Sequence, residues 1–504
     1  MRYIPDASQM KEADLYTIQK LNIPSLELME QAAISYIDVM IEKQLDMSHV
    51  CVVCGSGNNG GDGFAIARLL SSKNVKVTVV MAGNLDKVTK ETDYQIKRLK
   101  ESGVSIETNY IPGEYSIIVD AIFGVGLSRK IEGKYYELIQ QLNASSCIKF
   151  AVDIPSGISA DNGEVLGISF KADYTVTFQA EKIGHVVYPG KEFSGEIIIK
   201  DIGISETYFE NNSDVAVIYE KEDYKKLLPV RTENSHKGTY GKLLVIAGSK
   251  GMSGAAYMNA MSAYMSGAGL VQIYTSEDNR IILQSLLPEA IITTYENFDE
   301  KQLLQLIQWS DAICIGSGLG LSEVSRKILK TVIFESDVPC VIDADGLNIL
   351  SEHMWYLEKR KHNQYILTPH MKEMSRLTGF PIGTMIKDRK KIIEEFVTKY
   401  QLTCVLKDSK TFIKSYNKRM VINVSGNSSM AKAGSGDVLA GIIAGILVQN
   451  KCCSDSSVLG TYIHGKCGDV ARREMGSYSV MARDLIKCIG VVFKREEGKY
   501  YEEI

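Results

Sequence analysis

The sequence has no strong excess of charge of either sign. Its 504 residues include 57 Lys and Arg against 61 Asp and Glu, which gives a formal net charge of −4. A protein that holds nucleic acid or an anionic membrane by charge usually has a marked basic excess. The composition therefore gives no electrostatic reason to expect either partner, and neither nucleic acid nor a membrane is predicted.

Long apolar runs are also missing. The longest apolar helix candidate, Val438 to Val448, is too short to span a bilayer. The segment Met1 to Lys11 has no apolar core and includes Asp6, which is atypical of a secretory signal peptide. We therefore expect a cytoplasmic protein.

Cysteine is infrequent, with ten residues in the whole sequence. Cys51 and Cys54 have a C-x-x-C spacing, but no second pair follows, and a structural zinc site usually needs one. Most cysteines lie in apolar runs such as Cys340-Val341-Ile342. We therefore expect buried free thiols, and neither a zinc site nor a redox pair.

The pattern that is present is an alternation of strands and helices over more than one domain. In the first half an amphipathic helix is predicted from Ser25 to Met47, and another begins near Phe64 after a glycine-rich turn. The predicted strands of this half are His49–Cys54, Val75–Met81, Ile117–Phe123, Ile148–Ile154, Tyr174–Phe178 and Glu196–Ile199. This order predicts a Rossmann-like, doubly wound α/β domain with a parallel sheet.

A polar, charged stretch from Ser205 to about Ser235 interrupts the alternation. A second α/β pattern follows it. Its predicted strands are Lys242–Ala247, Leu270–Tyr274, Ala312–Ile315, Cys340–Asp343, Tyr365–Leu367 and Cys404–Leu406. We therefore predict two α/β domains, residues 1–214 and residues 224–496, with the polar stretch as their connection.

The segment Gly55–Gly63 follows the first predicted strand and opens the next helix. It contains G-x-G-x-x-G, the spacing that lets backbone amides approach the pyrophosphate of a dinucleotide. A redox Rossmann domain also has an acidic residue at the end of its second strand, but that strand ends Met81-Ala82-Gly83-Asn84. Dinucleotide contact is therefore predicted without hydride transfer. The alternative is a tight turn that only packs the helix, which the polar Asn58, Asn59 and Asp62 disfavour.

Carboxylates follow two later strands of the same predicted sheet. Asp120 and Asp153 would each more often be a cap or turn residue if taken alone. Ligands of parallel sheets bind beyond the carboxyl ends of the strands, however, so two carboxylates there favour a site. Asn59, Asp120 and Ser156 offer hard oxygen donors, which suit a small hard cation better than zinc.

These motifs resemble those of a known family. The segments Pro24–Glu30, Gly57–Gly63 and Val152–Gly157 are similar to NAD(P)H-hydrate (NAD(P)HX) epimerase domains, over roughly residues 1–214. The resemblance implies a potassium ion on Asn59, Asp120 and Ser156, and a catalytic Asp153 as acid, base or anchor. It also implies that the damaged cofactor is bound by Asn58, Asn59, Gly60, Gly61, Asp62, Gly124, Val125, Gly126, Leu127, Ser128, Arg129, Lys130 and Asp153. Arg129-Lys130 departs from the residues that many relatives have in this loop.

The second domain is organised around the segment Ala431–Gly441. Gly434 and Gly436 precede Asp437, which stands at the start of an apolar helix. A helix N-terminus presents free N–H groups and the positive end of the helix dipole, and the glycines let a phosphate approach them. Asp437 could there take a proton from a substrate hydroxyl. The structural alternative is an N-cap aspartate.

Polar loops also end the other predicted strands of this domain. They are Gly248–Ala256, Gly316–Gly320, Asp343–Asn348, Thr368–His370 and Lys407–Thr411. The first of them is not a Walker loop, because no Gly-Lys-Ser/Thr ends it. A single histidine such as His370 is more often an ordinary surface or core residue, but its place after a strand favours a functional role.

This set of loops resembles the ribokinase-like fold, and closely the ADP- or ATP-dependent NAD(P)HX dehydratases, from about Tyr224 to Ile489. The matching segments are Gly254–Ala256, Ser266–Val271, Gly316–Gly320, Asp343–Asn348, Thr368–His370 and Gly434–Asp437. The resemblance implies that Ala255, Gly318, His370 and Asp437 bind the hydrate, and that Asp437 is catalytic. It implies an ADP- or AMP-binding set of Lys407, Asp408, Ser409, Lys410, Thr411 and Gly436. Lys372, Asp408 and Lys432 stand where the family usually has Gly, Gly and Thr.

The combined resemblance implies a bifunctional repair enzyme for the hydrated cofactors NADHX and NADPHX. The first domain would interconvert the R and S hydrates. The second would phosphorylate the ring hydroxyl of the S hydrate with ADP and magnesium, after which phosphate leaves. Bacterial relatives of the fused type favour ADP over ATP, and a homo-oligomer is expected.

Two rival hypotheses remain at this point. The second domain could be a small-molecule kinase of the hydroxymethylpyrimidine or hydroxyethylthiazole type, because the Gly-Ser-Gly-Asp motif is shared across that fold. The fused epimerase-like domain argues against it. The first domain could be an inactive binding module, against which the retention of Asn59, Asp120, Asp153 and Ser156 argues.

Overall fold

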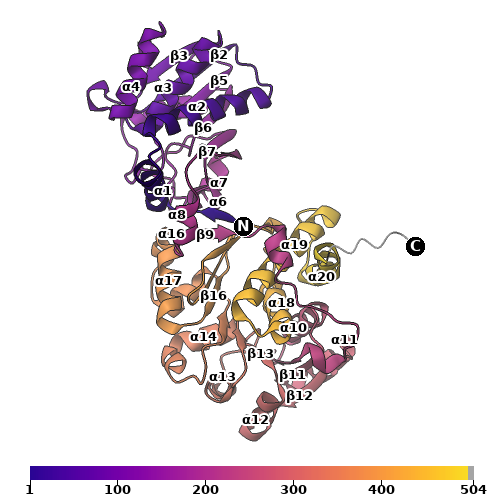
Figure 1. The fold of residues 1–504 in the computed structure, drawn as a ribbon. Coiled ribbons are helices and arrows are strands. Elements are labelled where there is room, and N and C mark those ends of the chain that lie inside the picture. The colour runs from indigo at the N-terminus through magenta and orange to yellow at the C-terminus, as the bar shows by residue number, and fades with distance from the viewer. Residues whose placement is uncertain (498–504) are drawn as a thin grey trace. The chain divides into compact units, whose positions relative to one another are not determined.

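Each half of the chain is built on its own, mostly parallel β-sheet (Figure 1). The computed structural model describes residues 1–497. The chain divides into two compact units, Arg2–Ala216 and Val217–Ile504, with Met1 grouped with the second. The α/β class predicted for both halves is confirmed.

The N-terminal unit has a seven-stranded parallel sheet in the order β4-β3-β2-β5-β6-β7-β8. The strands are β2 His49–Cys54, β3 Lys76–Met81, β4 Ile106–Glu107, β5 Ile117–Ala121, β6 Ile148–Val152, β7 Tyr174–Phe178 and β8 Glu196–Lys200. The order reverses between β2 and β5, as in a doubly wound sheet. The carboxyl ends of these two strands therefore flank the crevice in which such sheets bind ligands.

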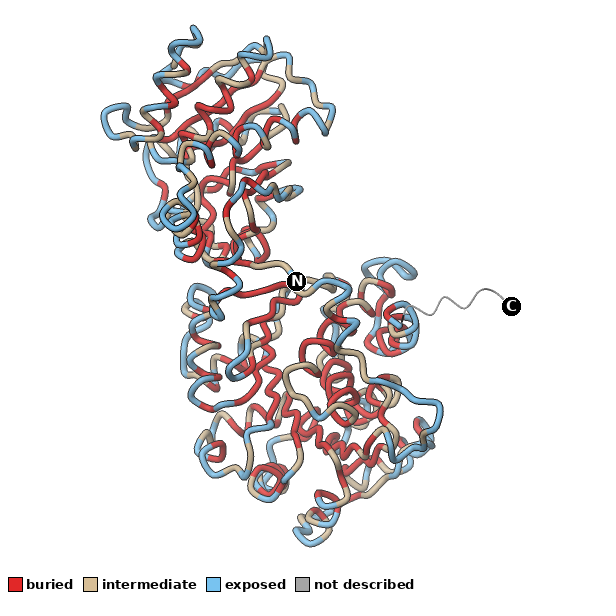
Figure 2. The backbone as a smooth tube through the Cα atoms, viewed as in Figure 1, coloured by how far each residue is buried: buried red, intermediate tan, exposed pale blue. Residues whose placement is uncertain are grey.

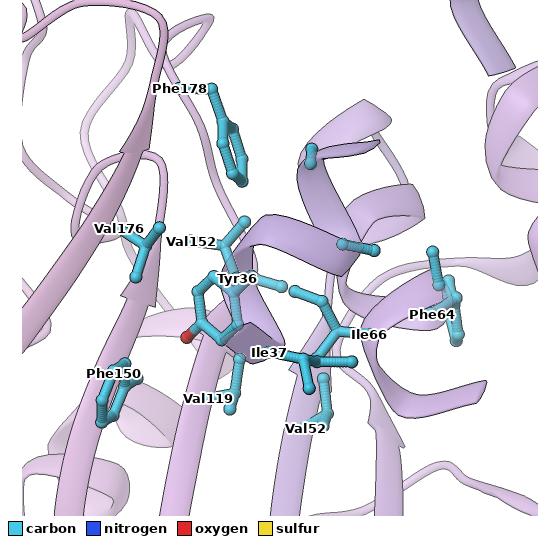
Figure 3. Packing of buried hydrophobic residues seen from close by; sticks show 14 of the residues in the cluster. Tyr36, Ile37, Val52, Phe64, Ile66, Val119, Phe150, Val152, Val176 and Phe178 are labelled. Atoms are coloured by element: carbon cyan, nitrogen blue, oxygen red, sulfur yellow. The ribbon is translucent and has the colours of Figure 1, made fainter. Parts of the chain in front are cut away.

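Helices cover both faces of this sheet. In strand β2, Val50 and Val52 pack in one cluster with α2 and α3, whereas Cys51 and Val53 pack in another with α5. Figure 3 shows Tyr36 and Ile37 of α2 lying over Val52, Val119 and Val152 of the strands. The unit's helices are α1 Ala7–Lys20, α2 Ser25–Glu42, α3 Asn58–Ser72, α4 Lys90–Glu101, α5 Lys134–Ala144, α6 Ile183–Val186, α7 Gly190–Phe193 and α8 Thr207–Asn211, and a short strand β1, Arg2–Ile4, precedes them.

Helix α3 begins six residues earlier than predicted, at Asn58 and not near Phe64. Gly57 is its N-cap, and most of the glycine-rich segment forms the first turns of the helix. Gly60 and Gly63 are required for this packing, because a Cβ atom would lie 1.9 Å from the carbonyl oxygen of Gly55 and 2.5 Å from Cβ of Ala121, respectively. The helix therefore approaches the sheet closely at the cost of its low intrinsic propensity.

The C-terminal unit has strands in the order β9-β18-β17-β16-β15-β14-β13-β10-β11-β12. The pairs from β12 to β16 are parallel, and β16, β17 and β18 pair antiparallel. The strands are β9 Ala216–Ile218, β10 Lys242–Ile246, β11 Leu270–Ser276, β12 Ile291–Tyr295, β13 Ala312–Ile315, β14 Cys340–Ile342, β15 Tyr365–Leu367, β16 Thr403–Leu406, β17 Thr411–Ser415 and β18 Val421–Asn423. The central parallel strands are buried (Figure 2).

The helices of this unit are α9 Lys221–Lys225, α10 Ser253–Met265, α11 Arg280–Leu286, α12 Glu300–Trp309, α13 Glu323–Glu335, α14 Asp345–Glu352, α15 Met371–Thr378, α16 Ile382–Lys387, α17 Arg389–Tyr400, α18 Ser435–Asn450, α19 Cys453–Met475 and α20 Ala482–Glu496. Helix α18 is buried from Val438 to Val448 and packs against α10, α19 and β13. Gly441 and Gly445 make the α10 packing possible, because a Cβ atom on either would lie within 2.6 Å of a carbonyl oxygen of α10.

Helix α18 begins at Ser435, and its N-cap is Gly434 with a φ of 88°. Asp437 is therefore the third residue of the helix, and the alternative in which it caps the helix is wrong. Glycine suits position 434, because other residue types rarely adopt this left-handed conformation. This leaves the Asp437 side chain free for a role other than capping.

The ten cysteines are all free thiols, and seven of them are buried, as expected from the sequence. Within residues 1–497, none of the helices has the length and apolar character that crossing a membrane requires.

Candidate active sites

A cavity of about 700 Å³ lies in the N-terminal unit at the carboxyl ends of β2 and β5. Its wall includes the start of α3, the loop after β5, the end of β6 and one face each of α1 and α2. The position agrees with the crevice that the strand order predicts. The cavity is large enough for a substantial part of a dinucleotide.

Asp153 follows β6 and lines this cavity with a left-handed φ of 65°. Its carboxylate accepts hydrogen bonds from Thr177 Oγ1 at 3.0 Å and from the backbone N–H of Phe178 at 3.3 Å, and it pairs with the ammonium of Lys182. Burial alone would raise the pKa of Asp153, but the charge and hydrogen bond of Lys182 outweigh burial and lower it. Asp153 is therefore held as a carboxylate, as a proton acceptor requires.

Lys182 is fully buried at the N-cap of α6. Besides Asp153, its ammonium donates to Thr177 Oγ1 at 2.8 Å and to the carbonyl oxygen of Phe178 at 3.2 Å. These three acceptors use all three N–H groups of the ammonium. Lys182 is thus committed to positioning Asp153 and has no donor left for a ligand.

Two more carboxyl groups line the same cavity, Asp14 from α1 and Asp62 from α3. Burial, and next the negative charge of Asp153, raises the pKa of Asp14 to about 6. Burial, followed by the charges of Asp153 and Asp14, raises the pKa of Asp62 well above its ordinary value. The cavity therefore contains one carboxylate, Asp153, and two carboxyl groups whose pKa values are raised, so that they take up a proton more readily than an ordinary aspartate.

Asp120 and Ser156 lie together behind the cavity wall. Asp120 is fully buried and accepts hydrogen bonds from Ser156 Oγ at 2.6 Å and from the Ser156 backbone N–H at 2.8 Å. Burial raises the pKa of Asp120 to about 6, although the bonds from Ser156 act in the opposite direction. Asn59 lines the cavity and packs against Gly124, and its Nδ2 is buried without a hydrogen-bond partner in the described part of the chain.

The structure brings most of the N-terminal site residues predicted from the sequence to this one cavity. The predicted residues in its wall are Asn58, Asn59, Asp62, Gly124, Val125, Gly126, Leu127, Ser128, Arg129 and Asp153. Gly60, Gly61 and Lys130, although described, are not among the residues that line it. Gly60 and Gly61 are buried inside α3, where they serve its packing.

In the C-terminal unit, polar groups gather at the carboxyl ends of β13 to β16. Asp343, directly after β14, accepts from Thr368 Oγ1 at 2.6 Å and from Lys407 Nζ at 2.7 Å. Lys407 follows β16, and a Cβ atom on Gly436 would lie only 3.4 Å from its Nζ. The ammonium therefore stands at the N-terminus of α18. Burial alone would lower the pKa of Lys407, but Asp343 and Glu373 raise it, so the side chain remains charged.

Asp437 lies in the first turn of α18 and is half-buried. Its backbone carbonyl accepts from Asn259 Nδ2 at 2.6 Å, which fixes this turn against α10. Burial, and next the negative charge of Asp343, raises the pKa of Asp437 to about 6. A carboxyl group with this pKa is ionised at neutral pH and remains basic enough to take a proton from a hydroxyl.

A histidine of α19 supports the start of α18. Ser435 Oγ lies 3.2 Å from Nε2 of the half-buried His464 of α19. Burial lowers the pKa of His464 to about 4, so the imidazole is neutral at neutral pH. It therefore orients Ser435 without placing a second positive charge beside Lys407.

The three predicted hydrate-binding residues other than Asp437 occupy neighbouring loops. A Cβ atom on Gly318, whose φ is 60°, would lie 2.9 Å from Cβ of Ala255. His370 follows β15 and caps α15, where its Nδ1 accepts from the backbone N–H groups of Lys372 and Glu373 at 3.1 and 3.2 Å. The imidazole ring is half-exposed, and its Nε2 lies 3.5 Å from Oε1 of the buried Glu373.

The loop between β16 and β17 contains the predicted nucleotide residues from Lys407 to Thr411. Asp408, one of the departures from the family pattern, pairs with the buried Arg389 at 2.9 Å, so its charge is neutralised within the protein. Lys410 Nζ donates to the carbonyl oxygen of Val424 at 2.8 Å. Lys432, another departure, donates to the carbonyl oxygen of Tyr478 at 3.1 Å.

Two models of known protein families match this chain, one in each unit. The family model of NAD(P)H-hydrate dehydratase matches residues 243–490, and the model of the YjeF-related protein N-terminus matches residues 25–184. A bifunctional NAD(P)H-hydrate repair enzyme from Coxiella burnetii is 34% identical over 488 residues, which are 96% of this chain and 98% of the relative. The chain belongs to the family of bifunctional NAD(P)H-hydrate repair enzymes.

Solved structures resemble the C-terminal unit of this repair-enzyme chain. The ADP/ATP-dependent NAD(P)H-hydrate dehydratase of Bacillus subtilis, co-crystallised with ATP and Mg²⁺, is 32% identical with a TM-score of 0.50, over 56% of this chain and 99% of that one. A ribokinase-like superfamily protein from Enterococcus faecalis is 27% identical with a TM-score of 0.50, over 55% and 95%. The predicted ribokinase-like fold is confirmed.

Sequence reasoning missed two residues of the repair enzyme's N-terminal cavity, Asp14 and Lys182. Asp14 lies on an ordinary amphipathic helix, and no short motif surrounds it. Lys182 is 29 positions from its partner Asp153, and nothing in the sequence between them signals the contact. The segment from Ala180 to Val187 is largely buried, and it contains Lys182. A buried lysine needs a carboxylate partner, so this lysine is the signal that could have pointed to the ion pair.

Proposed function

We propose that this chain repairs hydrated nicotinamide cofactors by two reactions. The N-terminal unit interconverts the R and S epimers of NADHX and NADPHX, and the C-terminal unit converts the S epimer to NADH or NADPH at the expense of ADP. The observation that carries the proposal is the identity to a bifunctional repair enzyme along nearly the full length of both chains. The two separate polar sites agree with it.

The dehydration begins with transfer of a phosphoryl group to the ring hydroxyl of the hydrate. Asp437 takes the hydroxyl proton while the oxygen attacks the terminal phosphorus of ADP, and AMP leaves. Hydroxide is a poor leaving group, whereas phosphate is a good one. Loss of phosphate with a proton from the adjacent ring carbon then restores the double bond, so the products are NAD(P)H, AMP and inorganic phosphate.

The residues around Asp437 suit the charge of this step. Lys407 and the backbone N–H groups at Gly436 face the region where negative charge develops on the transferring group. Magnesium, which accompanies nucleotide phosphates, would neutralise part of the ADP charge when bound. The loop from Asp408 to Thr411 would hold the nucleotide, and Ala255, Gly318 and His370 the hydrate.

The epimerisation takes place at the carbon that bears the hydroxyl, next to the ring nitrogen. The cofactor would lie across the start of α3 and the loop Gly124–Arg129, where α3 offers an N-terminus to its pyrophosphate. Asp153 would be the proton acceptor, and Lys182 holds it in the ionised state.

A potassium ion fits the chemistry of Asn59, Asp120 and Ser156. The buried Asp120 has only neutral hydrogen-bond donors around it among residues 1–497, so a monovalent cation would balance its charge. Asn59 would contact the ion through its side-chain oxygen, because the amide nitrogen is a hydrogen-bond donor. When bound, the ion would supply positive charge behind the cavity wall. We expect Asp120→Ala to weaken hydrate binding at this cavity and leave ADP-dependent dehydration unchanged, as measured by titration in potassium and in sodium buffer.

The test of the main proposal is an assay of the purified chain on a mixture of R and S hydrate. With ADP and Mg²⁺, both epimers should disappear and NADH should form in equal amount. Without ADP, the two epimers should only equilibrate, which separation on a chromatography column would detect. Phosphorylation of a hydroxymethylpyrimidine or hydroxyethylthiazole without NADH formation would instead support the rival small-molecule kinase.

A further inference from the structure

Helix α1 turns one face toward the N-terminal cavity. Met10, Asp14 and Ile18 follow one another at intervals of four residues, and all three line the cavity. Asp14 is the one acidic residue on that face. It has no hydrogen bond and no ion pair with any residue from 1 to 497. A half-buried carboxyl group that faces a cavity and has no partner in the protein is available to a ligand.

The position of Asp14 is fixed at both ends of the helix. At the N-terminus, Asp6 and Gln9 form a capping box, and the backbone N–H of Ala7 donates to Asp161 Oδ1 at 2.8 Å. One turn after Asp14, Thr17 Oγ1 accepts from the backbone N–H of Ser205 at 3.0 Å. These bonds join α1 to other segments of the same unit, so its cavity-facing residues are held in place.

The charged groups around Asp14 come from every wall of the cavity. They are Asp62 of α3, Asp153 after β6, Lys182 at the start of α6 and Arg129 of the loop after β5. Lys182 is committed to Asp153, as described above. Asp14 therefore faces the negative charge of Asp153 without a cation of its own. Its pKa, raised to about 6 mainly by burial and next by Asp153, lets it hold a proton in weakly acidic solution.

Inversion of the hydroxyl-bearing carbon needs two proton-transfer groups. In one direction the hydroxyl must gain a proton to leave as water, with the electron pair of the ring nitrogen completing the bond to carbon. A second water then adds to the other face of that carbon and must lose a proton. The number of atoms and protons is conserved, because one proton is given and one is taken.

We propose that Asp14 is the second catalytic residue of the epimerisation, the proton donor that works together with the acceptor Asp153. The inference rests on the proposed function of the N-terminal unit. The two carboxyl groups share a single proton, and the reverse reaction uses the same pair with exchanged roles. A pair with no proton, or with two, is inactive.

The pH dependence of epimerisation follows from the single proton that Asp14 and Asp153 share. Epimerisation should lose activity at low pH when Asp153 is protonated and at high pH when Asp14 is ionised, so the profile is bell-shaped. In kcat/KM, which reports the free enzyme, the alkaline limb should lie near pH 6.

The experiment compares the full-length wild type with Asp14→Asn and with Asp38→Asn, an exposed aspartate of α2 in the same unit. Epimerisation is followed in ¹⁸O-labelled water after subtraction of the uncatalysed rate. We expect the wild type to incorporate one labelled oxygen for each inversion. Asp14→Asn should lower kcat by about 100-fold or more with little change in KM, and the remaining activity should lack the alkaline limb. Asp38→Asn should equal the wild type, and Asp14→Glu should recover part of the rate.

The possible outcomes are distinguishable. If the wild type does not interconvert the epimers, the proposed function itself fails. If the wild type does so and Asp14→Asn keeps its rate and its alkaline limb, Asp14 is not the donor. Inversion without oxygen exchange in the wild type would overturn the step in which water leaves. ADP-dependent dehydration of the S hydrate by Asp14→Asn, together with an unchanged melting temperature, shows that the variant is folded.

Discussion

The carboxyl group of Asp437 lies in the first turn of α18, where the partly buried ammonium of Lys407 acts on it electrostatically. Asp437→Asn keeps the size of the side chain and removes its basicity. We expect kcat for dehydration of the S hydrate to fall by about 10²–10⁴-fold, with little change in the affinity for ADP. In the wild type, the rate should rise as pH increases through about 6, because the base must be ionised.

A matched control for this variant is Asp337→Asn, which changes an exposed aspartate of the same unit. It should retain the wild-type rate and pH profile. Epimerisation by Asp437→Asn should also be intact. Dehydration by Asp437→Asn at close to the wild-type rate would mean that another group is the base, and His370 or Asp345 would then be the next residues to test.

A second prediction at the residue scale concerns the ion pair of Lys182 and Asp153. Lys182→Met keeps most of the side-chain volume and removes the charge that lowers the pKa of Asp153. Burial then outweighs the remaining hydrogen bonds from Thr177 and Phe178, so the pKa of Asp153 should rise and its acidic limb in the epimerisation profile should move up by about 1–3 pH units. Lys171→Met, at an exposed position, should leave the profile in place. An unmoved limb in Lys182→Met would show that Lys182 does not control Asp153.

The residues that could be predicted from the sequence are those in short motifs. Asp437 follows two glycines, and Asp153 follows a strand, so local pattern and family resemblance were enough for them. Lys182 depends on a contact with the distant Asp153, and Asp14 depends on a fold that brings α1 to the cavity, and no local pattern reveals either. The same holds for Asp408, whose departure from the family pattern is explained by its pairing with Arg389, 19 positions away.

At the scale of elements, the glycines at the start of α3 should differ in how much they matter for packing. We expect Gly60→Ala to destabilise the N-terminal unit by about 2–3 kcal/mol or more, because its Cβ atom would lie 1.9 Å from a carbonyl oxygen of Gly55. Gly57→Ala should be close to neutral, since nothing lies within 4 Å of its Cβ position. Thermal and urea unfolding of the two full-length variants would measure the difference, and equal stabilities would contradict the close approach of α3 to the sheet.

The order of strands and helices was predictable, but several boundaries were not. The sequence predicted a loop over residues 58–63 because glycine disfavours helices, yet tertiary packing places them in α3. Likewise, α18 begins three residues before its apolar run. The antiparallel strands β17 and β18 and the edge strand β12 were not predicted, since they are short and flanked by polar residues.

At the scale of the whole molecule, each site is built from residues of one unit. We therefore expect two inactive variants to complement each other in solution. Asp437→Asn alone should equilibrate the epimers without forming NADH, and Asp153→Asn alone should consume only the S hydrate. A mixture of the two chains should convert the R hydrate completely to NADH with ADP present. Continued accumulation of the R hydrate in the mixture would show that both reactions must occur on one chain.

Over a full catalytic cycle, we expect the ion pair between Lys407 and Asp343 to affect how quickly the products leave the site. The ammonium of Lys407 already has Asp343 as its counter-ion in the protein without ligands. A nucleotide phosphate would therefore share the ammonium with Asp343. When AMP and inorganic phosphate depart, Lys407 would return to its ion pair with Asp343, so its charge would not be left unpaired in a partly buried position. We therefore expect the internal carboxylate to weaken product inhibition and to shorten the time before the next damaged cofactor can bind.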